Sequence, residues 1–228
     1  ITLRQADSLI LKPLPYARKE IQYVRKLIPG KVVTGNMATE LYFKQHASEY
    51  DILHLSMHTL LNDKDPLYSK LVFSQESDTL EDGLLNTWEI YGLDLKARMA
   101  VLSACNTGSG QLRHGEGMMS LARGFKYAGV PTLITTRWEV EDQAGAELMD
   151  LFYRNLRHGQ PADIALRNAK LTFLAHTDLL HSDPYFWAGY SLIGKPQHLF
   201  YPWKSMLVIL LAGSSIMILL SARRKNKT

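Results

Sequence analysis

The chain has 228 residues, 46% of them hydrophobic and 21% charged, and these proportions are ordinary for a chain that buries one globular core. The formal net charge of +4 is too small to indicate a nucleic-acid-binding protein, since basic residues outside the C-terminal tail do not gather with aromatic ones. A single cysteine excludes a disulfide framework and a structural zinc site, and no Walker, His-Glu-x-x-His or complete dinucleotide-binding glycine motif is present, so we expect no metal and no cofactor.

Hydrophobic periodicity alternates along the chain between the helical and the strand pattern, as in a fold built from βαβ units. In chain order, the pattern predicts a helix over 15–27, strand 31–34, helix 39–47, strand 51–57, short strand 70–74, short helix 88–92, strand 99–104, helix 117–127 capped by Gly129, strand 131–136, helices 140–156 and 161–175, and strand 186–193. The run over 99–104 is almost continuously apolar, which is typical of a parallel strand buried on both faces. The sequence therefore predicts an α/β domain over 1–197.

A charge-free segment near the C-terminus predicts a membrane span. Residues 205–222 contain no charge, and as a helix they would be about 27 Å long, close to the thickness of the hydrocarbon core. Tyr201 and Trp203 precede this segment and the basic tail 223–228 follows it, as interfacial anchors do. We expect a transmembrane helix over 205–222 joined to the domain by a juxtamembrane linker over 198–204. A C-terminal core helix is the alternative.

The basic tail also predicts an orientation, because positively charged flanks favour the cytoplasmic side. We expect a single-pass membrane protein with a cytoplasmic tail and an extracytoplasmic domain. A tail-anchored protein with a cytoplasmic domain is the alternative. The chain starts at Ile1 without an initiator methionine or a signal-peptide pattern, so we expect it to be part of a longer protein.

Two of the apolar runs end in side chains that can form a thiol–imidazole pair. His58 follows the run over 51–57, and Cys105, the only cysteine, follows the run over 99–104. Catalytic groups of open α/β sheets gather outside the carboxyl ends of the strands, so the two side chains converge if these strands are neighbours. The alternative is that Cys105 is a small buried core residue. We expect His54 to be a hydrogen-bonded core or supporting histidine and not the base, and His114 to be a loop residue.

Five sequence blocks stand in a characteristic order: LHLSMH (53–58), LSACNTG (102–108), GEG leading into LARGFKYAG (115–129), WEVED (138–142) and WAGYSLIG (187–194). Together with LPYARKEI (14–21), they resemble the CHAT domain, a caspase-like module related to separases and often found beside tetratricopeptide repeats. The resemblance covers about 13–197. It implies a three-layer α/β sandwich with a mostly parallel central sheet and the activity of a cysteine endopeptidase.

The resemblance also implies roles for individual residues. Cys105 would be the nucleophile and His58 the general base and acid. Backbone N–H groups of Cys105 and of the residue after the histidine would bind the oxyanion. That residue is Thr59, where caspase-like enzymes usually have glycine. Because a β-branched residue tolerates fewer backbone angles, we expect a less well-formed oxyanion hole and an activity that is latent or weakened.

Substrate choice is expected to depend on the loop after the strand over 131–136. In the resembled family this loop lines the pocket for the side chain before the scissile bond, and here it carries Glu139, Glu141 and Asp142. Carboxylates pair with arginine or lysine, so we expect cleavage after a basic residue. The alternative, which does not exclude the first, is that these acids offset the dipole of the following helix.

The expected function is therefore that of a membrane-anchored, caspase-like cysteine endopeptidase with a protein substrate. Its expected regulator is an N-terminal repeat or sensor region, or a partner protein. The alternative is a catalytically silent CHAT module that serves in signalling or as a scaffold. No nucleic-acid partner is expected.

Overall fold

A four-stranded mixed sheet forms the centre of the protein, in the strand order β1-β5-β6-β7. The computed structural model describes residues 11, 14–76, 80–103, 116–138 and 140–201. Strands β1, β5 and β6 are parallel, and β7 runs antiparallel to β6. The strands are β1 (Ile52–Leu55), β5 (Met99–Leu102), β6 (Thr132–Thr136) and β7 (Tyr190–Gly194).

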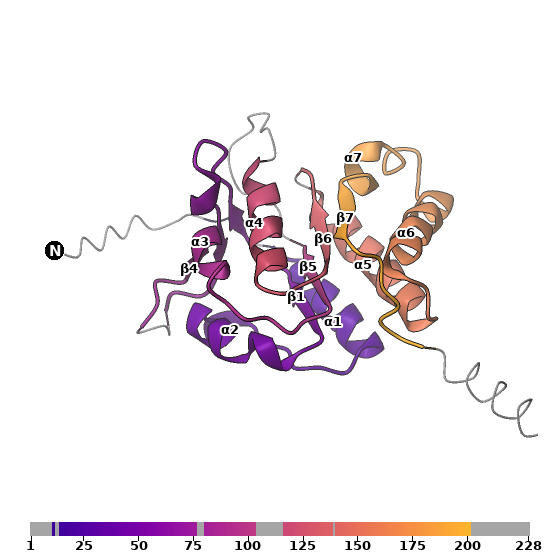
Figure 1. Ribbon diagram of the computed structural model, residues 1–228. Helices are drawn as coiled ribbons and strands as arrows, with labels where there is room; N and C mark the ends of the chain where they lie inside the picture. Colours follow the sequence, from indigo (N-terminus) through magenta and orange to yellow (C-terminus); the bar gives the residue numbers. More distant parts are fainter. Residues whose placement is uncertain (1–10, 12–13, 77–79, 104–115, 139, 202–228) are drawn as a thin grey trace, which may run out of the picture.

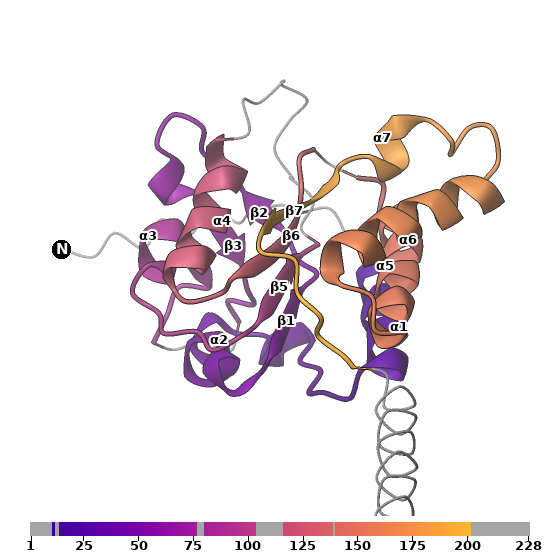
Figure 2. The same cartoon turned by 45° about the vertical axis from the view of Figure 1, so that its right-hand side comes forward.

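Helices cover both faces of this sheet and complete an α/β/α arrangement (Figures 1 and 2). Residues of β5 alternate between two apolar cores, with Ala100 and Leu102 in one and Met99 and Val101 in the other. This alternation follows from the two-residue period of a strand. The first core is closed by α2 (Glu40–His46), α3 (Thr87–Ile90) and α4 (Glu116–Tyr127), and the second by α1 (Ala17–Leu27), α5 (Asp142–Arg157) and α6 (Ala162–His176).

A small antiparallel sheet, in the order β2-β3-β4, lies beside the central one. It starts with the residue after His58, so the chain passes from one sheet to the other at the predicted site. The strands are β2 (Thr59–Leu60), β3 (Lys70–Val72) and β4 (Leu84–Asn86). Short helices complete the described chain: η1 (Gly35–Met37), η2 (Ala47–Glu49), η3 (Pro66–Tyr68) and α7 (Pro184–Trp187).

Two strand predictions differ from the structure. Residues 31–34 form no strand, although Val32 and Val33 favour one. The predicted strand over 186–193 divides into the end of α7 and β7, with Gly189 between them. A Cβ atom at Gly189 would lie 2.9 Å from the Val140 side chain and 3.1 Å from Trp138, so the backbone passes these residues closely at the break.

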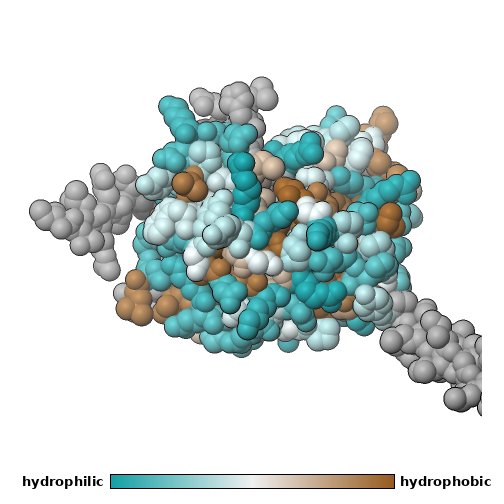
Figure 3. Space-filling view, viewed as in Figure 1, coloured by the Kyte–Doolittle hydropathy of each residue, from teal (hydrophilic) through white to brown (hydrophobic). Residues whose placement is uncertain are grey.

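The prediction of a transmembrane helix is wrong, and with it the single-pass, membrane-anchored localisation and the membrane contact of residues 205–222. No helix among the described residues is long and apolar enough to cross a membrane. The longest described helix, α5, has 16 residues and carries charged side chains, whereas a helical span needs about 20 predominantly apolar residues. The segment 205–222 itself lies outside the described residues. The face in Figure 3 is mostly hydrophilic, with apolar residues in small groups.

Candidate active site

The pairing of β1 with β5 brings the ends of the two motif-bearing strands to one edge of the sheet. The strands are parallel, and Leu55, the last residue of β1, pairs with Leu102, the last residue of β5. His58 follows Leu55 by three positions, and Cys105 follows Leu102 by the same number. Both strands therefore end at the same level and run in the same direction. Cys105 and His114 lie outside the described residues.

The backbone around Thr59 has strand geometry. The His58 carbonyl accepts a hydrogen bond from the Val72 N–H at 3.0 Å, and Thr59 pairs with Leu71 in the antiparallel ladder. Thr59 therefore occupies the position between two hydrogen-bonded pairs, where the N–H points away from β3. No described non-glycine residue has a positive φ, so this segment does not require the conformational freedom of glycine. A β-branched residue fits a strand well.

A buried chain of polar contacts adjoins the segment that carries His58. The Glu20 carboxylate of α1 accepts a hydrogen bond from Ser56 Oγ at 2.7 Å, and its other oxygen lies 3.0 Å from His54 Nε2. His54 Nδ1 lies 2.9 Å from the Tyr153 hydroxyl. Burial raises the pKa of Tyr153 well above its ordinary value, and the negative charge of Glu20 acts in the same direction. The expected hydrogen bond of His54 is present at Nδ1, and its role as a supporting residue stays a prediction.

Glu20 was not among the site residues that the sequence predicted. A signal for it does exist, because Glu20 stands four and seven positions before Val24 and Leu27, which pack against the core. These spacings place an acidic residue on the buried stripe of an amphipathic helix. Such a residue needs a buried partner.

A cavity of about 10 Å³ lies where α1, the ends of β1 and β5, the start of α5 and the start of β7 meet. This volume corresponds to about one water molecule. Ser103, which directly follows β5, and Tyr190, which starts β7, close one side through a contact of 3.1 Å between their hydroxyl groups. The polar residues that line the cavity are Glu20, Ser56, Ser103, Glu141, Asp142 and Tyr190.

Asp142 lies at the first turn of α5 and lines this cavity. Its carboxylate accepts a hydrogen bond from the backbone N–H of Tyr16 at 2.7 Å, so it ties the start of α1 to the start of α5. Burial raises the pKa of Asp142, and the negative charges of Glu20 and Glu141 act in the same direction. The Tyr16 N–H and His58 act in the opposite direction. The influence of His58 and Glu20 on this carboxyl indicates that the three groups share one electrostatic environment.

Glu141, another of the predicted acidic residues, both caps α5 and lines the cavity. Glu141 is the N-cap of α5, and its side chain accepts a hydrogen bond from the Ala144 N–H at 2.7 Å. It also lines the cavity, so the capping role and a place at the site coexist. Glu139 lies outside the described residues.

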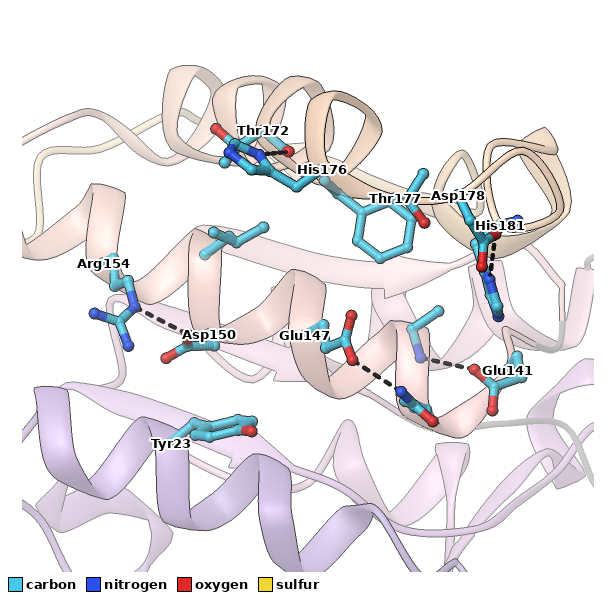
Figure 4. Close-up of a pocket in the computed structure, with 14 residues that line it drawn as sticks. Tyr23, Glu141, Glu147, Asp150, Arg154, Thr172, His176, Thr177, Asp178 and His181 are labelled. Carbon is cyan, nitrogen blue, oxygen red and sulfur yellow. Dashed lines mark hydrogen bonds and ion pairs between the residues drawn. The ribbon is translucent and has the colours of Figure 1, made fainter.

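A larger groove of about 560 Å³ runs along α5 between α1 and α6 (Figure 4). It shares Glu141 with the small cavity. Several of its charged side chains already pair with one another, since Arg154 lies 2.8 Å from Asp150 and His181 lies 2.7 Å from Asp178. No sequence motif indicated this groove.

One group of carboxylates among the described residues has a spacing that could hold a metal ion. The ligand atoms of Glu40, Glu81 and Glu89 lie within 4.8 Å of one another. Lys44 Nζ lies 2.7, 3.1 and 2.9 Å from these three carboxylates. Hydrogen bonds to them raise the pKa of Lys44, although burial acts the other way. The lysine thus already supplies the positive charge that such a cluster requires.

Comparison with known proteins adds three findings. The CHAT domain family matches residues 2–195. The chain is 24% identical over 220 residues to tetratricopeptide repeat protein 28 of Mus musculus, and the same identity over the same length holds for that of Homo sapiens. Each match covers 83% of this chain but only 9% of the relative, so the chain spans a small part of the length of these curated relatives.

Proposed function

Because the chain belongs to the CHAT domain family, which is related to caspase-like peptidases, we propose that it is a cysteine endopeptidase. Cys105 is the nucleophile, and His58 is the general base and acid. The observation that supports this most strongly is the parallel pairing of β1 with β5, with Leu55 opposite Leu102. This register directs the two motifs to the same edge of the sheet.

The proposed reaction is an acyl transfer to sulfur. The Cys105 thiolate, formed when His58 takes its proton, attacks the carbonyl carbon of the scissile peptide bond. The carbonyl electron pair moves to the oxygen, where the N–H groups of Thr59 and Cys105 stabilise the negative charge. The C–N bond then breaks, and the leaving amine takes the proton from His58. Water, activated by His58, hydrolyses the resulting thioester and regenerates the thiol.

We propose that the protein substrate is cleaved after a basic residue. Asp142 and Glu141 line the cavity beside the edge of the sheet, and Glu139 belongs to the same sequence block. Carboxylates pair with an ammonium or guanidinium group through charge-assisted hydrogen bonds. An aspartate-specific pocket would need a basic lining.

The proposed enzyme is latent in the described conformation. A cavity of about 10 Å³ cannot accept a lysine or arginine side chain, and one oxygen of the Asp142 carboxylate already accepts a hydrogen bond from the Tyr16 N–H. Opening the pocket would require the start of α1 to move. We propose that an N-terminal repeat or sensor region, or a partner protein, controls this movement, in keeping with the repeats for which the relatives are named.

A second candidate function is a catalytically silent CHAT module that acts in signalling or as a scaffold. The same two observations favour it, namely the small volume of the cavity and the hydrogen bond from the Tyr16 N–H to Asp142. The two functions differ in whether Cys105 ever cuts a peptide.

The test is cleavage of a mixed-sequence peptide library by the chain and by Cys105→Ala, His58→Ala and Asp142→Ala variants. We expect cuts after arginine or lysine that disappear in the first two variants and lose their preference in the third. Asp163→Ala is the matched control for Asp142, since Asp163 also stands in the first turn of a helix, α6, but is exposed. Cuts that persist without Cys105 would contradict the peptidase, and a lack of any cuts would favour the silent module.

A further inference from the structure

We propose that Glu20 is a positioning residue for His58, which it holds in place through the hydroxyl group of Ser56. The catalytic consequence of this inference rests on the proposed function, in which His58 is the general base. Glu20 belongs to helix α1, whereas Ser56 and His58 belong to the segment that leaves β1. The first helix would thus be part of the machinery that orients the site.

The burial of Glu20 indicates that its carboxylate has a specific partner in the fold. Glu20 is 3% exposed, and a buried carboxylate is costly unless hydrogen bonds compensate for the lost water. One of its oxygens accepts a hydrogen bond from Ser56 Oγ at 2.7 Å, and the other lies 3.0 Å from His54 Nε2, in an ion-pair contact without hydrogen-bond geometry. Both partners come from β1 and its exit, so the carboxylate links α1 to that strand.

The backbone geometry explains why this link matters for His58. The chain bends at Met57, between the end of β1 at Leu55 and the start of β2 at Thr59. After the bend, the His58 carbonyl is fixed by the Val72 N–H at 3.0 Å. Before the bend, Ser56 lies outside the paired part of β1, and its side chain is fixed by Glu20. The direction of the bend therefore depends on the Ser56–Glu20 hydrogen bond.

The orientation of the Glu20 carboxylate is itself fixed from the other side. His54 contacts its second oxygen, and the opposite ring nitrogen of His54 contacts the hydroxyl of Tyr153 at 2.9 Å. Tyr153 is fully buried in α5. Glu20 is therefore held between β1 and α5, which is the kind of supporting shell that a catalytic side chain requires.

The test compares Ser56→Ala with Ser120→Ala, which removes a hydroxyl from a buried serine in α4, 3% exposed. Two rates are measured: alkylation of Cys105 by iodoacetamide near neutral pH, and peptide cleavage. Because Cys105 is the only cysteine, alkylation reports on it alone. We expect Ser56→Ala to lower the alkylation rate and kcat by about 10- to 100-fold with an unchanged KM, as misplacement of a catalytic group does. Ser120→Ala should change neither, and the two variants should have similar Tm values.

Substitutions at Glu20 separate the hydrogen bond from the charge. Glu20→Gln keeps an oxygen that accepts from Ser56. Its NH2 group can donate to His54 Nε2 when the proton of the His54 ring is on Nδ1, from which it is donated to the Tyr153 hydroxyl. We expect Glu20→Gln to retain most of the reactivity and Glu20→Ala to lose as much as Ser56→Ala. The double variant Glu20→Ala/Ser56→Ala should be no worse than either single variant, because both remove the same interaction. Additive losses would overturn the inference.

Amide hydrogen exchange over residues 56–60 distinguishes failure of this inference from failure of the proposed function. We expect faster exchange there in Ser56→Ala and Glu20→Ala than in Ser120→Ala. Unchanged exchange would overturn the positioning role, whatever the activity. A further outcome is that exchange increases in Ser56→Ala and Glu20→Ala while Cys105 of the His58→Ala variant is alkylated as fast as in the wild type. In that case the positioning of the segment stands and the proposed Cys105–His58 pair is wrong.

Discussion

The negative charge of the Asp142 carboxylate, which would bind a basic substrate side chain in the proposed function, lowers the stability of the folded state. Because burial raises the pKa of Asp142, the folded chain binds this proton more tightly than the unfolded chain. The resulting stabilisation is complete below the unfolded pKa, about 3.9, and is lost as the pH rises through the folded pKa. At neutral pH the carboxylate therefore favours the unfolded state relative to a neutral group in the same place.

Asp142→Asn is therefore expected to stabilise the protein at neutral pH. The asparagine retains an oxygen that can accept the Tyr16 N–H and removes the charge. We expect a higher Tm than in the wild type at pH 7, and a difference that shrinks as the pH falls toward 4. Thermal unfolding followed by circular dichroism at several pH values measures it. Asp163→Asn, at the exposed start of α6, should not raise the Tm, and a lower Tm for Asp142→Asn at pH 7 would refute the argument.

The residues of the site differ in how far the sequence could predict them. His58 and Cys105 stand at the ends of apolar runs, and a parallel sheet brings the ends of its strands to one edge, so a local pattern was enough to nominate both. Glu20 contacts Ser56 across 36 positions of the chain. No local pattern carries that pairing, and only the position of an acidic residue on an apolar helix stripe could have pointed to it.

Among the elements, the turn between α4 and β6 depends on a single glycine. Gly129 has a φ of +112°, and a Cβ atom there would collide with the carbonyl oxygen of Leu95. The Leu95 N–H donates to the Ala128 carbonyl at 2.7 Å, so this backbone cannot retreat without breaking a hydrogen bond. We expect Gly129→Ala to cost about 2 kcal/mol or more of the free energy of unfolding, measured in urea.

Gly30 is the matched control for this substitution. It lies in open space, because a Cβ atom added there would have no neighbouring atom within 4 Å, and its φ is not positive. We expect Gly30→Ala to be neutral or to stabilise the protein by about 0.4–1 kcal/mol, because alanine reduces the freedom of the unfolded chain. Equal losses of unfolding free energy in Gly129→Ala and Gly30→Ala would mean that the close approach of Gly129 to Leu95 does not cause the loss.

The elements also show where sequence patterns fail. The long helices α1, α4 and α5 have an amphipathic pattern, β5 and β6 are short runs buried at every position, and all of these elements follow the predictions closely. Residues 31–34 have strand propensity, but β1 is the edge of the central sheet and they do not pair with it. Strand propensity depends on finding such a neighbour. Strands β2 and β4, with two and three residues, are too short for a period to be recognised.

Across the whole molecule, the two cores are joined through β5. Phe125 of α4 and Phe152 of α5 are both fully buried, in different cores on opposite faces of the sheet. Consecutive residues of β5 belong to the two cores in turn. Loss of one core would therefore expose every second side chain of β5, the strand on which the other core also packs. The cores are therefore expected to unfold together.

This coupling gives a prediction for Phe125→Ala, Phe152→Ala and their double variant. Each single substitution should cost about 3–5 kcal/mol, since it removes a large buried ring. The two losses should add to within about 0.5 kcal/mol, because the rings share no core. Urea unfolding, followed by circular dichroism and by tryptophan fluorescence, should give one coincident transition in each variant that still folds. We expect one transition because β5 cannot stay folded when one of its two faces has lost its core, and two separate transitions would mean instead that the layers on either side of β5 are independently stable.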